Sequence, residues 1–162
     1  MRKTILIILA LLVVVAVCAD RIGFTAETKI NGLVWMTRNT GGDKKDILGG
    51  KYDFKQAQTA CPDGWRLPTR AEYEALIKNR SRSSTYKDLT GRWFSGSEPD
   101  WRNAPAVFLP RIYRDSKFDA GYYWTSTPFD KNQSYALVFN AKNVYVNPID
   151  TKNKAAVRCV KQ

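Results

Sequence analysis

The cysteines are the side chains of this chain with the clearest reactive chemistry. The 162-residue sequence holds three of them, Cys18, Cys61 and Cys159, and it holds no histidine. A thiolate can attack a substrate or bind a metal ion, but histidine is the base that most often activates it. Without histidine, no Ser-His-Asp or Cys-His arrangement can form, and no zinc site with a histidine ligand. The sequence therefore predicts no catalytic residue, no metal ligand and no cofactor.

The first residues have the pattern of a secretory signal peptide. Arg2 and Lys3 form a basic start, and an uninterrupted apolar run extends from Ile5 to Val17. This run is shorter than the roughly 20 residues that a helix needs to cross a bilayer. We expect residues 1–19 to be a signal peptide.

The cleavage site decides where the protein is held. Cleavage after Ala19 leaves residues 20–162 as a single domain that is secreted or displayed at the cell surface. The alternative is an outer-membrane lipoprotein anchored at Cys18, although the branched Val17 fits poorly before a lipidated cysteine. A membrane is an expected partner only in this second case.

The composition is strongly basic, with 26 Lys and Arg against 15 Asp and Glu and a formal net charge of +11. A basic surface favours polyanions such as nucleic acid, acidic polysaccharide or anionic membrane. The cations are scattered without a long basic block, and an exported protein seldom meets nucleic acid. We therefore expect a glycan, a surface polymer or an envelope protein as partner, and no nucleic acid. The alternative is that the charge serves solubility alone.

The two cysteines that remain after export, Cys61 and Cys159, are expected to pair in an oxidising compartment. A bridge between them closes a loop near 100 residues, which stabilises a protein by about 4.7 kcal/mol on the chain-entropy model. The alternative is a reactive thiol at Cys61, which lies near Arg66 in the sequence but has no histidine to activate it.

The local signals predict one hairpin and two short helices. Residues 28–36 form the hairpin, because Asn31-Gly32 suits a type I′ turn. Asp53 and Thr69 each begin a helix, with the side chain three residues on completing a capping box. The second helix runs to about Lys78.

The rest of the chain divides into a loop and a set of strands. Residues 79–105 lack clear periodicity and are expected to form a long loop. The short apolar runs after it are typical of antiparallel strands; they lie at 106–109, 121–125, 135–139, 144–147 and 155–160. The fold class is then α+β, with two helices packed on a twisted antiparallel sheet.

The long loop holds the candidate ligand-binding residues. Aromatic rings beside hydrogen-bonding cations suit a carbohydrate or peptide surface. The candidates are Arg92, Trp93, Phe94, Glu98, Asp100, Trp101 and Arg102. The alternative is that the rings form a small core packed beneath the loop.

One segment of this loop, residues 97–101, is similar to the Glu-Pro-Asn segment with which calcium-dependent lectins hold a sugar. Carboxylate oxygens suit calcium, but a calcium site takes about six to eight oxygens. No Trp-Asn-Asp partner segment follows in the sequence. The alternative is a surface turn made by Pro99 and Asp100, so calcium binding by residues 92–102 stays an open question.

Other conspicuous side chains are expected to be structural. Large aromatic residues are buried more often than not, so Tyr122, Tyr123 and Trp124 are assigned to the core of the sheet. Arg66 is assigned to an ion pair or a contact with the backbone.

Several motifs together resemble the Fibrobacter succinogenes major paralogous domain family of exported bacterial proteins. They are GLVWMTRN (32–39), YDFKQAQTACPDGWRLPTRAEYEAL (52–76), FLPRIYRD (108–115), YYWTST (122–127) and AAVRCVKQ (155–162). The resemblance implies a C-type-lectin-like fold and a Cys61–Cys159 disulfide. It also implies export, often with attachment to the cell surface.

These observations predict an exported, non-enzymatic binding module for a glycan or a cell-surface polymer. One alternative is a structural or assembly protein of the cell surface. Another is an enzyme on the scaffold of formylglycine-generating enzymes, which share the broad fold. Those enzymes depend on active-site cysteines and copper, so a bridge that takes up both mature cysteines argues against that activity.

Overall fold

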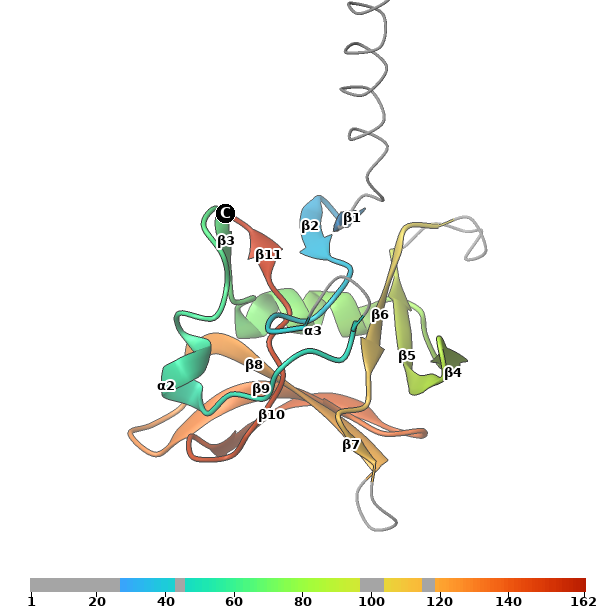
Figure 1. The fold of residues 1–162 in the computed structure, drawn as a ribbon. Coiled ribbons are helices and arrows are strands. Elements are labelled where there is room, and N and C mark those ends of the chain that lie inside the picture. Colours follow the sequence, from blue (N-terminus) through green and yellow to red (C-terminus); the bar gives the residue numbers. More distant parts are fainter. Residues whose placement is uncertain (1–26, 43–45, 97–103, 115–118) are drawn as a thin grey trace, which may run out of the picture.

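The computed structural model describes residues 27–42, 46–96, 104–114 and 119–162. Within these ranges the chain forms mainly antiparallel β-structure with two short helices (Figure 1). The expected signal peptide, with Cys18, lies outside the described residues. None of the helices within these ranges has the length and apolar character needed to cross a membrane.

The first sheet joins the two ends of the described chain. Its order is β1-β2-β11-β3, with bounds β1 (Glu27–Ile30), β2 (Leu33–Met36), β11 (Val160–Lys161) and β3 (Trp65–Arg66). The predicted β1–β2 hairpin is confirmed. Its turn residues Asn31 and Gly32 have φ angles of 50° and 83°, the left-handed conformation that a type I′ turn requires.

The two helices begin where the sequence predicts. Helix α2 (Phe54–Ala57) is capped by Asp53 and α3 (Arg70–Lys78) by Thr69, and both capping boxes form. The apolar pattern of the first helix continues to Cys61, but α2 ends at Ala57. Pro62 disfavours a helical conformation at the residue before it, and the disulfide draws Cys61 to the first sheet.

A three-stranded sheet overturns the prediction of a long loop. Strands β4 (Ser81–Tyr86) and β5 (Leu89–Ser95) form a hairpin, and β6 (Ala106–Pro110) pairs with the other side of β5. The hairpin turn is Lys87-Asp88, with φ angles of 49° and 61°. Sequence reasoning missed this hairpin because β4 is polar and its turn contains no glycine.

The largest sheet has the order β10-β9-β8-β7. Its strands are β10 (Val144–Asp150), β9 (Gln133–Phe139), β8 (Asp119–Pro128) and β7 (Tyr113–Arg114). The predicted runs fall inside β8, β9 and β10, which are longer than expected. The run at 155–160 is a strand only at its end, because it otherwise makes the isolated bridges Tyr52↔Ala155 and Tyr123↔Ala156.

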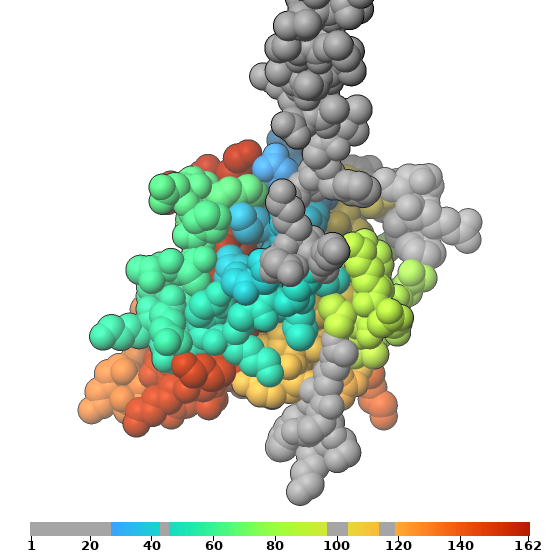
Figure 2. All heavy atoms as spheres, in the orientation of Figure 1, coloured from blue at the N-terminus to red at the C-terminus, as the bar shows by residue number. Residues whose placement is uncertain are grey.

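Side chains pack on both faces of the largest sheet. Alternation along β8 and β9 places Tyr123 and Leu137 in one core cluster and Trp124 and Ala136 in the other. Tyr123 and Trp124 are fully buried, as predicted, whereas Tyr122 is half-buried. Helix α3 lies between this sheet and the first sheet (Figure 1). Figure 2 shows residues 37–42 and 46–53, in cyan and teal, across the middle of the face in view.

A disulfide and a buried arginine tie the C-terminal segment to the rest of the fold. The predicted bridge between Cys61 and Cys159 is present, with Cα atoms 5.9 Å apart. Arg158 is completely buried and donates hydrogen bonds to Asn39 Oδ1, Met36 O and Phe108 O at 2.9, 2.9 and 3.0 Å. Because the bridge takes up both cysteines of the described chain, neither offers a free thiol.

Candidate functional site

Four of the predicted ligand-binding residues lie outside the described residues: Glu98, Asp100, Trp101 and Arg102. The calcium hypothesis rests on this same segment and therefore stays a prediction. Across the part of the chain that the structure describes, no group of three or more His, Cys, Asp or Glu side chains could hold a metal ion.

The other three predicted residues are consecutive in β5, so alternation separates them. Phe94 points into the main core, is completely buried and lies 5.9 Å from the Phe139 ring, centroid to centroid. Phe94 therefore belongs to the main core and not to a small core beneath a loop. Trp93 points to the opposite face and is half-buried.

Arg92 lies on the core face of β5 and joins two sheets. Its Nε donates to Ser81 Oγ at 3.1 Å, and its Nη1 lies 3.4 Å from the carbonyl oxygens of Asn140 and Ala141 in the β9–β10 turn. Burial lowers the pKa of Arg92, and the nearby Arg111 lowers it further. With 9% of its surface exposed, Arg92 positions β5 and offers little to a ligand.

The outer face of the β4–β5–β6 sheet carries three rings in mutual contact, Tyr86, Trp93 and Phe108, which we call the aromatic platform. Tyr86 lies 5.2 Å from Trp93 and 5.4 Å from Phe108, and Trp93 lies 5.2 Å from Phe108, all between ring centroids. Tyr86 is 39% exposed, whereas Phe108 is 3% exposed. The platform thus exposes the ring of Tyr86 and part of the ring of Trp93 to solvent, and both rings pack on the buried ring of Phe108.

A glycine makes room for this arrangement, and cations border it. A Cβ atom on Gly91 would overlap the Phe108 ring, so only glycine lets that ring lie against the strand. Lys87 Nζ lies 5.6 Å from the centroid of the Tyr86 ring, and Arg82 stands opposite Trp93 in the strand register. The platform therefore combines aromatic surface with positive charge.

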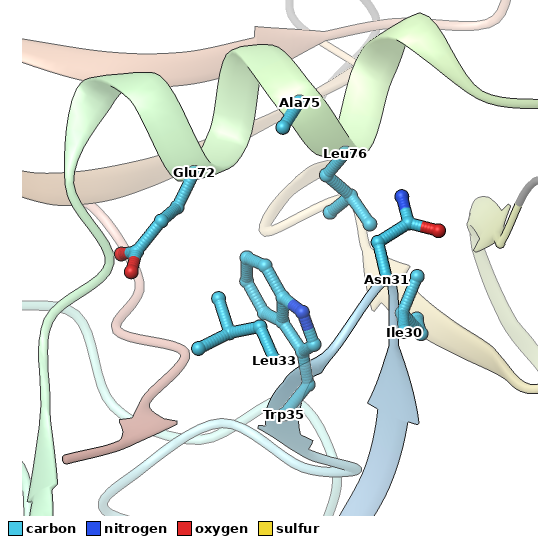
Figure 3. Close-up of a pocket in the computed structure, with 7 residues that line it drawn as sticks. All are labelled: Ile30, Asn31, Leu33, Trp35, Glu72, Ala75 and Leu76. Atoms are coloured by element: carbon cyan, nitrogen blue, oxygen red, sulfur yellow. The ribbon is translucent and has the colours of Figure 1, made fainter.

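A separate pocket of about 130 Å³ lies between α3 and the β1–β2 hairpin. Figure 3 shows its lining residues, which come from both elements: Ile30, Asn31, Leu33, Trp35, Glu72, Ala75 and Leu76. Trp35 is 1% exposed and forms one wall with its indole. In Figure 3 the indole nitrogen lies on the side of the ring that faces Asn31, Ile30 and Leu76.

Glu72 lies at the edge of this pocket, and both of its carboxylate oxygens accept hydrogen bonds from neighbouring residues. Its two carboxylate oxygens accept hydrogen bonds from Arg66 Nη1 and Nη2 at 2.8 and 2.6 Å, and one also accepts from the Thr69 N–H at 2.7 Å. Burial acts to raise the pKa of Glu72, but the hydrogen bonds from Arg66 and Thr69 outweigh it and lower that pKa. Arg66, predicted to make an ion pair or a contact with the backbone, makes both, because its Nη1 also donates to Leu67 O at 3.1 Å.

Sequence reasoning singled out Trp93 but missed Tyr86, Phe108 and the pocket. Tyr86 and Phe108 join Trp93 only through the pairing of β4 and β6 with β5, and that pairing depends on a hairpin hidden by its turn. The Asn31-Gly32 turn could be recognised from the sequence. The pocket beside it could not, because it depends on where α3 packs against the β1–β2 hairpin.

Comparison with known proteins gives a match to a family model. No curated protein and no solved structure matches this chain. A family model described as the Lcl C-terminal domain matches residues 25–161. Because that match spans all of the described residues except Gln162, the chain belongs to the Lcl C-terminal domain family.

Proposed function

We propose that this chain is an exported, non-enzymatic module that binds a glycan or another cell-surface polymer. The observation that carries the proposal is the aromatic platform. Tyr86 and Trp93 present ring surface to solvent and are held in place by Phe108 beneath them. Aromatic faces with a polar tip suit the apolar faces and hydroxyl groups of sugars.

The charge around the platform favours an acidic polymer. Lys87 lies against the Tyr86 ring, Arg82 stands beside Trp93, and the chain as a whole is strongly basic. Complementary charge raises the rate at which a polyanion is captured, and this contribution weakens as salt is added.

Export and the finer family assignment are parts of the same proposal. The Cys61–Cys159 bridge supports passage through an oxidising compartment, as a secreted protein or as a lipoprotein anchored at Cys18. The bridge and the two capped helices also support the resemblance to the Fibrobacter succinogenes major paralogous domain. The C-type-lectin-like fold that this resemblance implies is supported by the pairing of β2 with β11 near the two chain ends.

A panel of polymers tests the proposal. The folded, disulfide-bonded protein is incubated with immobilised alginate, pectin, chitin and cellulose at low and high salt, and the bound fraction is measured. We expect retention on at least one acidic polymer, with binding that falls as salt rises. Absence of retention on every polymer at low salt would overturn the proposal.

Docking to an envelope protein is the second candidate function, and one exposed side chain favours it. Phe129 is 52% exposed at the end of the β8–β9 hairpin, where its ring lies 5.5 Å from that of Tyr135. Arg70 covers the Tyr135 ring at 4.3 Å. Co-purification of one envelope protein that is lost in a Phe129→Ala variant would support this function.

A further inference from the structure

The pocket between α3 and the β1–β2 hairpin is suited to a small, mainly apolar group. Leu33, Trp35, Ala75 and Leu76 supply apolar walls. Its volume of about 130 Å³ compares with the 150 Å³ or so of an apolar cavity that holds a benzene molecule. Burying hydroxyl groups against such walls without partners is costly, so a whole sugar ring does not fit but a small substituent does.

One wall of the pocket carries a hydrogen-bond donor, the indole N–H of Trp35. Trp35 is 1% exposed, and its Nε1 is not among the buried side-chain atoms of the described chain that have no hydrogen-bond partner. In Figure 3 the nitrogen lies on the side of the ring that faces Ile30, Asn31 and Leu76, which also line the pocket. The carbonyl oxygen of a ligand held there can accept a hydrogen bond from it.

The mouth of the pocket offers an amide. Asn31 is exposed, and its backbone is fixed by the turn at a φ of 50°. Its side chain makes no hydrogen bond to other described residues. Its Oδ1 lies 3.4 Å from the position that a Cβ on Gly96 would occupy. The pocket therefore opens next to the end of β5, the strand that carries Trp93 of the aromatic platform.

The carboxylate of Glu72 adds no free charge to the pocket. Both of its oxygens accept hydrogen bonds from Arg66, so the pair is neutral as a unit. The group that fits is then neutral and carries a methyl for the apolar walls, a carbonyl oxygen for the Trp35 N–H and an N–H for Asn31. An acetamido group has all three features.

We propose that this pocket binds the acetamido group of an N-acetylated amino sugar. The methyl packs between Trp35 and Leu76, the carbonyl oxygen accepts from Trp35 Nε1, and the amide N–H donates to Asn31 Oδ1. This assignment rests on the proposed glycan-binding function and names the sugar class. An O-acetyl ester shares the methyl and the carbonyl but has no N–H to donate to Asn31.

Nuclear magnetic resonance on the 15N-labelled protein tests the assignment. The indole N–H resonance of Trp35, identified with a Trp35→Phe variant, is followed during titration with the trisaccharide of N-acetylglucosamine. We expect a saturable shift, and at least about tenfold weaker binding of the glucosamine and glucose trisaccharides. Equal binding of an O-acetylated glucose trisaccharide, or a response to an acetyl-lysine peptide alone, would overturn the assignment to acetamido sugars.

Two variants of pocket-lining residues and one control variant distinguish a loss of binding at the pocket from a loss of folding. Ala75→Leu keeps a good helix former on the exposed side of α3 and fills the pocket, so binding should be lost. Ala71→Leu makes the same change on the same helix without lining the pocket, and binding should be unchanged. Asn31→Gly preserves the turn and removes the amide, which should weaken binding about threefold to tenfold.

The pocket and the aromatic platform are tested by separate variants. A Tyr145→Ala variant, which removes an exposed ring that does not line the pocket, should leave the shift of the Trp35 resonance intact. Normal binding by Ala75→Leu, or no Trp35 shift in a protein that still binds a polymer, would overturn the pocket assignment and leave the proposed function standing.

Discussion

The rings of Tyr86 and Trp93 lie with their centroids 5.2 Å apart across the β4–β5 hairpin, and both contact Phe108 on β6. Three strands are thus needed to assemble one small aromatic surface. Phe108 is almost completely buried beneath the other two rings, so the surface is a rigid continuation of the sheet. Rigid aromatic side chains lose little conformational entropy when they bind, which suits a recognition site.

Gly91 is predicted to be essential for this surface. In Gly91→Ala the new methyl would overlap the Phe108 ring and lie 2.5 Å from the Leu109 carbonyl oxygen. We expect a loss of stability of about 1 to 3 kcal/mol in urea unfolding, together with weaker polymer binding. Gly96→Ala is the control, because among the described residues its Cβ would meet no atom closer than 3.4 Å. Equal stability of the two variants would contradict the packing described for Phe108.

The Lys87-Asp88 turn of the β4–β5 hairpin is predicted to lower the stability of the protein relative to a turn with glycine. Asp88 has a φ of 61°, where glycine has no steric cost. Asp88→Gly should therefore raise the unfolding free energy by about 0.5 to 1 kcal/mol. Gly64 has a φ of 77°, and no atom of the described residues lies within 4 Å of the position that its Cβ would take, so Gly64→Ala should lower the unfolding free energy. A less stable Asp88→Gly variant would show that the turn has another conformation.

The two hairpin turns, Asn31-Gly32 and Lys87-Asp88, show which parts of the fold the sequence could predict. The Asn31-Gly32 hairpin and the helices capped by Asp53 and Thr69 follow from local chemistry, and all three were found. The β4–β5 hairpin was missed because Lys87-Asp88 reaches the same turn geometry without the residues that signal it. Tertiary pairing of β5 with β6 stabilises a turn that its own residues disfavour.

Glu72 is predicted to make stability depend on pH. Its pKa in the folded protein lies below its ordinary value of 4.5, so folding favours the charged form. The contribution is complete above that value and is lost as the pH falls through the lower folded pKa. At pH 6 we expect Glu72→Gln to be less stable by about 1 to 2 kcal/mol.

Urea unfolding at pH 6 and pH 3 measures this effect. The difference between wild type and Glu72→Gln should shrink at pH 3. Glu74→Gln, which removes a more exposed ion pair with Arg70, should change stability little at either pH. A difference for Glu72→Gln that is as large at pH 3 would contradict the role given to the Arg66 pair.

The disulfide is predicted to supply a large part of the stability. The Cys61→Ala/Cys159→Ala double variant loses a bridge with a sequence separation of 98, and a loop of that size corresponds to about 4 to 5 kcal/mol. Urea unfolding of wild type with and without reductant should show a loss of similar size. The double variant should not respond to reductant. A loss below about 1 kcal/mol would mean that the bridge contributes little.

The candidate site was less predictable than the fold. Trp93 was identified because it is a large aromatic residue next to an arginine, which can be read directly from the local sequence. Which neighbours face solvent depends on strand register, so Arg92 and Phe94 turned out to point inward while Tyr86 joined Trp93. The pocket beside Trp35 arises where α3 crosses the first sheet, an arrangement that no local pattern encodes.

The central claim is that the aromatic platform binds a polymer, and a pair of matched variants tests it most directly. Tyr86 is 39% exposed on the platform and Tyr145 is 46% exposed on β10 of the largest sheet. The dissociation constant for the polymer that the wild-type protein retains best is measured for Tyr86→Ala and Tyr145→Ala. We predict that Tyr86→Ala binds about fivefold to tenfold more weakly and that Tyr145→Ala stays within about twofold of wild type. Equal affinities for the two variants would contradict the account.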